Sequence, residues 1–273
     1  MRSGMSETLL KQADLAITQN GDYSLTENLS LGVDLGTATI VLVVLNSRKM
    51  PVACEIEAAS VVKDGLVVDY HGAMEIVRRL KSKLENRLGV RLARAAIAVP
   101  PGTSPENSGA HRHVVEACDL VVTTIVDEPT AANEVLEINS GVIVDIGGGT
   151  TGLTIFQNSK PVYTADEPTG GVHISLVLMG GRKISFEDAE KLKQSPSEAA
   201  NVMGMVKPVI QKMASITKKH IRGSIVDNIW LVGGTCCLTG FENVFEQEME
   251  IPTFKPIYPH MVTPLGIAMS CRE

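Results

Sequence analysis

The chain has 273 residues, enough for one large domain or two small ones. A net charge of −6 with 44% hydrophobic and 21% charged residues is typical of a globular protein and argues against a general nucleic-acid binder. No apolar run is long enough for a membrane helix, and the N-terminus lacks the apolar core of a signal peptide. The 5 cysteines include no C-x-x-C motif, so we expect neither disulfides nor structural zinc, and the expected setting is a reducing cytosol.

Residues 1–30 are predicted to form an N-terminal extension, a helix followed by a loop. Ser6 is placed to cap the helix. Four apolar residues would share one face of it: Leu9, Leu10, Ala13 and Ile17. Two interpretations stay open, because such a helix can pack on its own domain or serve as a docking tail for a partner.

From Leu31 onward, strand-like and helix-like segments alternate, which predicts an α/β fold. Apolar runs predict strands at Leu31–Leu35, Thr39–Leu45, Ala95–Val99, Val121–Val126, Gly141–Ile146, Gly152–Phe156 and Asn228–Val232. Apolar residues three and four apart predict helices at Ala73–Arg87, Glu106–Cys118, Phe186–Lys193, Pro196–Ile221 and Thr239–Glu248.

One segment of the chain is repeated. Val33–Ile40 (VDLGTATI) returns as Val144–Thr151 (VDIGGGTT), and each copy is predicted to be a strand, a Gly/Thr turn and a second strand. A duplicated unit predicts two similar halves, with the turns that follow Asp34 and Asp145 converging on one cleft.

The two turns have the composition of a phosphate site. Small residues let backbone N–H groups approach an anion, and hydroxyl groups add donors. The candidate phosphate-binding residues are Gly36, Thr37, Thr39, Gly147, Gly148, Gly149, Thr150 and Thr151. Carboxylates belong beside phosphate only when a cation bridges them, so Asp34 and Asp145 are predicted to hold Mg²⁺ on a polyphosphate, directly or through water.

The second turn also matches G-x-G-x-x-G at Gly147, Gly149 and Gly152. A dinucleotide site requires a helix after these glycines, whereas the segment that follows is predicted to be a strand. The sequence contains no G-x-x-x-x-G-K-[ST] motif either, so a P-loop enzyme is excluded.

Three further segments accompany the turns. Asp127–Ala132 places acids where a strand gives way to a helix, and Val232–Cys236 is a second strand-to-helix turn whose glycines can approach a base or ribose. Glu190 and Lys193 lie three apart on a predicted helix and point the same way. They either hold ribose hydroxyls or form a solvated ion pair.

These motifs resemble those of the superfamily of actin, sugar-kinase and heat-shock-chaperone ATPases. The resemblance covers residues 31 to 273, and four motifs occur in the order of that superfamily: Asp34–Thr37, Glu128–Ala132, Asp145–Thr150 and Gly233–Thr235. It implies two RNase-H-like lobes with ATP or ADP and Mg²⁺ in the cleft. The first lobe would be residues 31–140 with the C-terminal helix 259–273 returning to it, and the second residues 141–258.

The resemblance also implies roles for individual residues. Asp34 and Asp145 would surround Mg²⁺, and Glu128 would complete the catalytic set by positioning the attacking water. The remaining contacts, to the nucleoside, would come from Gly233, Gly234, Glu190 and Lys193.

Within the superfamily, the short chain and the stretch Val62–Asp69 resemble a chaperone-like family of bacterial ethanolamine utilisation. This implies an ATP-binding accessory protein, cytoplasmic or at a microcompartment, that assists assembly, refolding or reactivation of ethanolamine ammonia-lyase or of the shell, with no nucleic-acid or membrane partner. The alternatives are an actin-like filament or scaffold protein and a small-molecule kinase.

The sequence departs from the superfamily near the phosphates. Gly152 stands where an acid is common, and Lys63 is only a poor candidate for the lysine that chaperone ATPases place near the γ-phosphate. We therefore expect nucleotide binding with slow hydrolysis.

Overall fold

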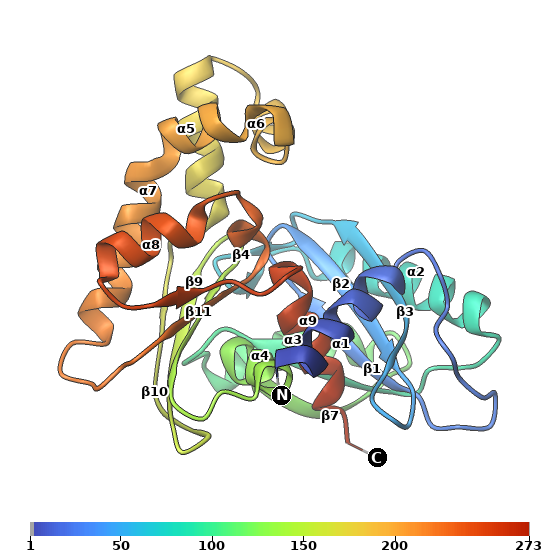
Figure 1. Cartoon of the computed structure of the whole chain (residues 1–273). Coiled ribbons are helices and arrows are strands. Elements are labelled where there is room, and N and C mark those ends of the chain that lie inside the picture. Colours follow the sequence, from blue (N-terminus) through green and yellow to red (C-terminus); the bar gives the residue numbers. More distant parts are fainter. Residues whose placement is uncertain (1–2, 273) are drawn as a thin grey trace. The chain divides into compact units, whose positions relative to one another are not determined.

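The computed structural model describes residues 3–272, and the chain divides into two compact units (Figure 1). Unit 1 runs to Ile138 and also includes the segment that starts at Met261, whereas unit 2 is Asn139–His260. None of the described helices combines the length and the apolarity that crossing a membrane requires.

Unit 1 contains a five-stranded sheet in the order β3-β2-β1-β6-β7. Its strands are β1 (Ser30–Leu35), β2 (Thr39–Leu45), β3 (Pro51–Ala58), β6 (Arg94–Val99) and β7 (Val121–Asp127). The first three pair antiparallel, while β6 and β7 continue the sheet parallel to β1. The other elements are α1 (Ser3–Leu15), the hairpin of β4 (Val62–Lys63) and β5 (Leu66–Val67), α2 (Tyr70–Leu88), α3 (Pro105–Glu116), α4 (Glu128–Leu136) and most of α9 (Pro259–Met269).

Unit 2 repeats this arrangement with the order β10-β9-β8-β11-β12. Its strands are β8 (Gly141–Ile146), β9 (Thr151–Gln157), β10 (Lys160–Glu167), β11 (Ile229–Val232) and β12 (Thr253–Phe254). Its helices are α5 (Gly171–Arg182), α6 (Phe186–Lys193), α7 (Ala199–His220) and α8 (Phe241–Met249), with 3-10 turns at Pro196–Glu198 and Gly234–Cys237.

The two sheets share strand order, strand sense and register. In unit 1, Asp34 lies opposite Val41 across the β1–β2 ladder, and in unit 2, Asp145 lies opposite Gly152 across the β8–β9 ladder. Both pairs are seven residues apart along the chain, so the sequence repeat corresponds to a structural repeat. The predicted fold class, two RNase-H-like halves of α/β structure, is confirmed.

The predicted strands and helices all form, with ends shifted by a few residues. Three longer elements were not predicted: β3, β10 and α5. The first five residues of β10 are exposed on both faces of the strand. The segment therefore lacks the alternation of apolar and polar residues by which a strand is predicted. In α5, glycines lie near both ends and weaken the helical signal.

The N-terminal helix α1 packs on unit 1. Leu10 and Ala13 are fully buried, and Ser6 lies inside the helix, where its hydroxyl donates to the Val135 carbonyl at 2.8 Å. The prediction that Ser6 caps the helix is therefore wrong, because α1 already includes Ser3. Arg87 of α2 donates to the carbonyls of Ala16 and Ile17, directly after α1, which satisfies acceptors that a helix end leaves open.

Helix α9 approaches its neighbours closely through glycines. A Cβ on Gly32 of β1 would lie 2.4 Å from the backbone N of Ala268. A Cβ on Gly266 would lie 1.8 Å from the carbonyl O of Ala131 in α4. Because a real Cβ cannot come so close, α9 can hold this position only with glycine at both sites.

We predict that Gly266→Ala lowers the free energy of unfolding by about 3 kcal/mol, because α9 must move away from α4 to admit the methyl group. Urea denaturation of the full chain measures this change. The matched control is Gly109→Ala in α3, where a Cβ meets no atom within 4 Å; it should be neutral or stabilising by up to about 1 kcal/mol. Equal stabilities for the two variants would contradict the packing argument.

Candidate functional site

The two predicted phosphate turns are closed by the same hydrogen bond. Gly36 N–H donates to the Thr39 carbonyl at 3.0 Å, and Gly147 N–H donates to the Thr150 carbonyl at 3.1 Å. In each case the donor is two residues and the acceptor five residues after the aspartate. The repeat therefore extends to the geometry of the turn, with one turn in each unit.

Backbone N–H groups inside both turns remain available. In unit 2, those of Gly148, Gly149 and Thr150 donate to no acceptor among residues 3–272. The same holds in unit 1 for Thr37 and Ala38, within the described part of the chain. Successive N–H groups of this kind form a concave donor surface suited to an anion.

Asp145 is held at the carboxyl end of β8, where only 6% of its surface is exposed. It is the partner of Val232 in the parallel β8–β11 ladder. Gly233, which directly follows Val232, has φ +93°, and a Cβ there would lie 2.5 Å from the Asp145 carboxylate oxygen Oδ1. The carboxylate thus occupies space that only a glycine at position 233 leaves open.

The turn of unit 2 is fastened to the start of α5 and to the Gly233–Thr235 segment. Gly171 N–H donates to the Gly147 carbonyl at 2.9 Å, and the Thr235 hydroxyl donates to the same carbonyl at 2.7 Å. Val172 N–H donates to the Gly148 carbonyl, also at 2.9 Å. The carbonyls of Gly147 and Gly148 are therefore satisfied inside unit 2.

Glu190 and Lys193 form an ion pair of 2.8 Å that is mostly buried, with 28% and 16% of the side chains exposed. Ser175, which is fully buried, connects them: it accepts from Lys193 Nζ at 2.9 Å and donates to the Glu190 carboxylate. A Cβ on Gly171 would lie 3.5 Å from Lys193 Nζ, so the cluster lies beside the start of α5.

This arrangement differs from a solvated ion pair, because it is buttressed by a buried hydroxyl next to the turn. The proposed contact of Glu190 and Lys193 with ribose stays a prediction. Sequence reasoning missed Ser175, since it lies on α5, which was not predicted.

In unit 1, the candidate residues gather at one edge of the sheet. Asp34 is near the carboxyl end of β1, and Glu128 begins α4 directly after β7, which runs in the same direction. Asp127 caps α4 by accepting from Thr130 N–H at 3.0 Å. The Lys63 hairpin reaches the same edge, because a Cβ on Gly65 would meet the Pro100 ring at 2.5 Å.

The structure therefore assembles the candidate residues as two sets, one in each unit. Asp34, Glu128 and the first turn lie in unit 1. The set of unit 2 consists of Asp145, residues 147–151, Glu190, Lys193, Gly233 and Gly234.

Other chemistry is not indicated by the described residues. No group of three or more histidine, cysteine or acidic residues in the described part of the chain is arranged to hold a metal ion. Burial raises the pKa of Cys54 to about 12, and burial together with the charge of Asp145 raises that of the Cys236 thiol. Both thiols are therefore poor nucleophiles at neutral pH.

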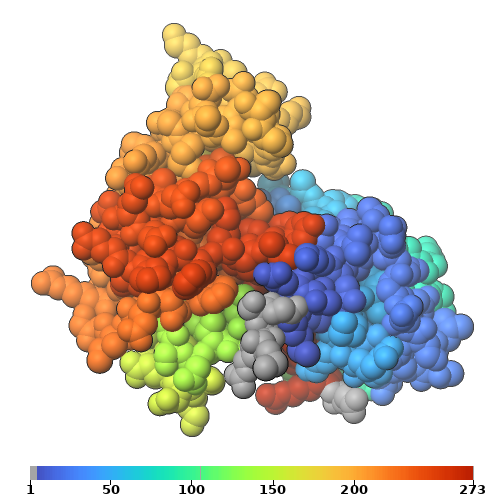
Figure 2. Space-filling view, in the orientation of Figure 1, coloured from blue at the N-terminus to red at the C-terminus, as the bar shows by residue number. Residues whose placement is uncertain are grey.

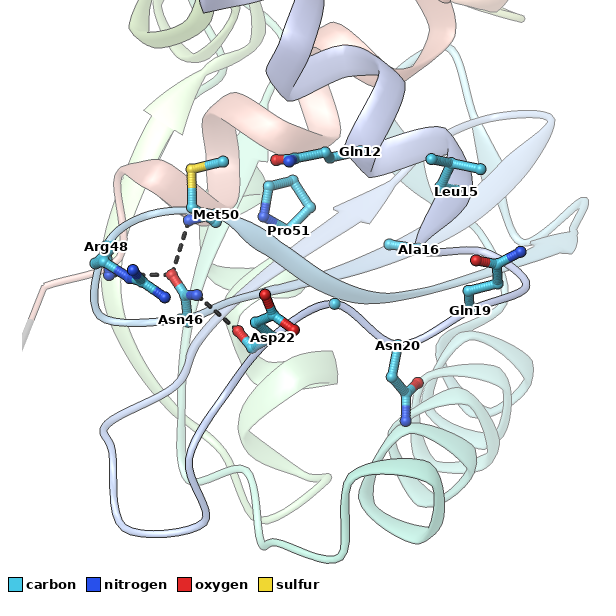
Figure 3. A pocket seen from close by; sticks show the side chains of 11 residues that line it. Gln12, Leu15, Ala16, Gln19, Asn20, Asp22, Asn46, Arg48, Met50 and Pro51 are labelled. Atoms are coloured by element: carbon cyan, nitrogen blue, oxygen red, sulfur yellow. Dashed lines mark hydrogen bonds between the residues drawn. The ribbon is translucent and has the colours of Figure 1, made fainter.

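A pocket of about 510 Å³ lies in unit 1, apart from the candidate residues (Figure 3). It is bounded by the end of α1, the loop that follows it and the turn between β2 and β3. Asn46 shapes its wall by donating to the Asp22 carbonyl at 2.8 Å and accepting from Met50 N–H at 2.9 Å. None of the predicted site residues lines it.

Two family models match parts of the chain. The model described as Cell division protein FtsA matches residues 142–267, and the model described as MreB/Mbl protein matches residues 49–180. Among solved structures, MreB5 of Spiroplasma citri bound to AMPPNP superposes with a TM-score of 0.73 over 89% of this chain and 95% of that one, at 15% identity. The fold is that of the actin-like ATPases.

Two further relatives are much more similar in sequence. Ethanolamine utilization protein EutJ of Salmonella typhimurium is 44% identical over 89% of this chain and 86% of its own length. The crystal structure of EutJ from Carboxydothermus hydrogenoformans has a TM-score of 0.92 at 47% identity, covering 98% of this chain and 99% of that one. The chain belongs to the EutJ family.

We predict that Gly233→Ala destabilises the protein by about 3 kcal/mol, because the new methyl group would collide with the Asp145 carboxylate at a backbone angle unfavourable for alanine. Gly234→Ala is the matched control, since a Cβ there meets no atom within 4 Å. Its effect should stay within about 0.5 kcal/mol. Thermal unfolding without added ligand measures both, and a Gly233→Ala variant as stable as the control would refute the assigned contact.

Proposed function

We propose that the chain binds ATP or ADP with Mg²⁺ through its two aspartate-led turns and acts as an accessory protein of bacterial ethanolamine utilisation. The observation that carries the nucleotide part is the duplicated turn, with the same closing hydrogen bond and available N–H donors in both copies. Membership of the EutJ family supports the ethanolamine-utilisation part.

The residues present suit Mg²⁺ beside phosphate. Asp34 and Asp145 offer the carboxylate oxygens that this cation prefers, and each is followed by a turn with N–H groups that bond to no acceptor among residues 3–272. When bound, Mg²⁺ would offset the charge of the phosphate oxygens. The turns would then hold the phosphates, and Gly233 and Gly234 would lie against the adenosine.

Glu190 and Lys193 are proposed to hold the ribose. In support, the buried Ser175 hydroxyl fixes both head groups close to the start of α5, so little side-chain entropy remains to be lost on binding. Glu128 is proposed to orient the attacking water. With Gly152 in place of an acid, the water lacks a second orienting group, and hydrolysis should be slow.

We further propose that nucleotide binding drives a chaperone-like cycle on a client protein, either ethanolamine ammonia-lyase or a microcompartment shell protein. A lyase that carries a large cofactor can be trapped by a damaged one, and an ATP-dependent remodeller would release it. This step is an analogy between systems. Recovery of lyase activity from cofactor-inactivated enzyme, with and without ATP, tests it.

Mg²⁺-ATP should raise the melting temperature of the chain. At a ligand concentration 100 times the dissociation constant, binding adds about 2.7 kcal/mol to the free energy of unfolding. Differential scanning fluorimetry with ATP, ADP or GTP, each with Mg²⁺ or with EDTA, measures the effect. No Mg²⁺-dependent shift with any of these nucleotides would refute the proposal.

One isosteric variant and one truncating variant should separate nucleotide binding from nucleotide hydrolysis. Asp145→Asn keeps the shape of the buried side chain but removes a cation ligand, so Mg²⁺-nucleotide affinity should fall by about tenfold or more. Glu128→Ala should leave affinity within about twofold and lower the single-turnover hydrolysis rate by about a hundredfold.

Calorimetric titration with AMPPNP gives the affinities, and phosphate release gives the rates. Unmodified chain should turn over more slowly than about 10 per second, the median for enzymes. If Glu128→Ala abolished binding, or Asp145→Asn changed neither quantity, the roles assigned to these residues would be wrong.

A further inference from the structure

The solvent-exposed side of α7 carries positive charge only. The chain has no acidic residue between Glu198 and Asp227. Five exposed basic residues of this stretch form what we name the α7 basic stripe: Lys207, Lys212, Lys218, Lys219 and Arg222. The four lysines belong to α7, the orange helix of Figure 1, and Arg222 follows its end; the orange atoms of this segment reach the surface of unit 2 in Figure 2. Such a concentration is unexpected in a chain with a net charge of −6.

Several other helices pair at least one lysine or arginine with an acidic residue of the same helix. Three of them carry an ion pair between residues four apart: Lys81–Glu85 in α2, Arg112–Glu116 in α3 and Glu187–Lys191 in α6. Over residues 3–272, the structure shows no ion pair for any member of the α7 basic stripe. Among the side chains of the stripe, only that of Lys218 makes a hydrogen bond within the described part of the chain, to the Glu248 carbonyl at 2.9 Å.

Helix electrostatics accounts for part of the stripe. Lys218 and Lys219 lie in the last turn of α7, where cations are favoured by the helix dipole. That effect fades within one turn, so it does not explain Lys207 or Lys212. The neighbouring helix α8 is acidic, but in the described part of the chain its glutamates form no ion pair with α7. Within unit 2, no carboxylate thus forms an ion pair with the stripe.

We propose that the α7 basic stripe is a docking surface for an acidic segment of a partner protein. A narrow segment fits better than a broad polyanion. α8 packs against α7, and Glu246 of α8 and Glu250 directly after it are exposed. A DNA duplex or an anionic bilayer is wide enough to cover both helices and would bring its phosphates against these carboxylates. A single helix is only about 10–12 Å wide, so one acidic segment can cover α7 alone.

The dimensions of the stripe define the segment. From Lys207 to Lys219 the helix rises by about 18 Å, and the four lysines project over an arc of about 140°. A partner helix of three to four turns, or an extended segment of about six residues, with acidic side chains along one side would cover it. Exposed ion pairs are individually weak, so the complex must be multivalent and sensitive to salt.

A synthetic peptide tests the proposal independently of nucleotide. The probe is a fluorescein-labelled peptide of about 16 residues with alternating pairs of glutamate and alanine, and its control has glutamine for glutamate. Fluorescence anisotropy with the full chain is measured at about 50 and 300 mM NaCl. The acidic peptide should bind at low salt and lose most of its affinity at high salt, whereas the glutamine peptide should not bind.

A charge-matched pair of triple variants locates the site. Lys207→Gln with Lys212→Gln and Arg222→Gln should weaken binding of the acidic peptide by at least about tenfold. The control removes three exposed cations of unit 1, by Lys11→Gln, Arg91→Gln and Arg94→Gln, and should bind like the unmodified chain. Thermal unfolding of both variants checks that each remains folded.

Equal weakening by both triple variants would overturn the proposal, because net charge alone would then explain binding. Absence of binding by the unmodified chain at low salt would also overturn it. Duplex DNA or phosphatidylserine vesicles are tested in parallel. Tighter binding of either one, lost in the α7 variant, would replace the acidic protein segment with that polyanion.

Discussion

The contact between Asp145 and Gly233 sets the geometry on which the candidate site of unit 2 depends. β8 and β11 lie side by side, and both end at the same edge of the sheet. The Asp145 carboxylate fills the space where a side chain at position 233 would be, and the positive φ of Gly233 turns the chain away from the strand. If residue 233 carried a side chain, the carboxylate and the turn that follows it could not both occupy this edge of the sheet.

The start of α5 plays a part different from that of the first helix in a dinucleotide-binding or P-loop fold. In those folds the helix N-terminus points its N–H groups at the phosphate. Here the N–H groups of Gly171 and Val172 bind the carbonyls of the glycine turn. The helix thereby orients the turn, and the donors of the turn itself, at Gly148 to Thr150, remain for an anion.

Charge is distributed unevenly over unit 2. Lys193 is enclosed with Glu190 and Ser175 next to the turn, where a buried hydroxyl and a carboxylate keep the ammonium in place. The lysines of α7 have no such partners among the described residues. The Lys193 ammonium is therefore held in one geometry, whereas the lysine side chains of α7 are exposed to solvent.

The sequence by itself determined the α/β class, the positions of the main strands along the chain and the two aspartate-led turns. Strand β2 is a continuous apolar run from Ile40 to Leu45, and the repeated Asp-x-Gly pattern is local, so neither signal depends on distant residues. The association of Ser175 with Glu190 and Lys193, the start of α1 before Ser6 and the exposed strand β10 were decided only by the tertiary structure. The physical reason is that burial and close approach join residues far apart in the chain. A local sequence pattern does not specify which distant backbone or side chain will pack against it.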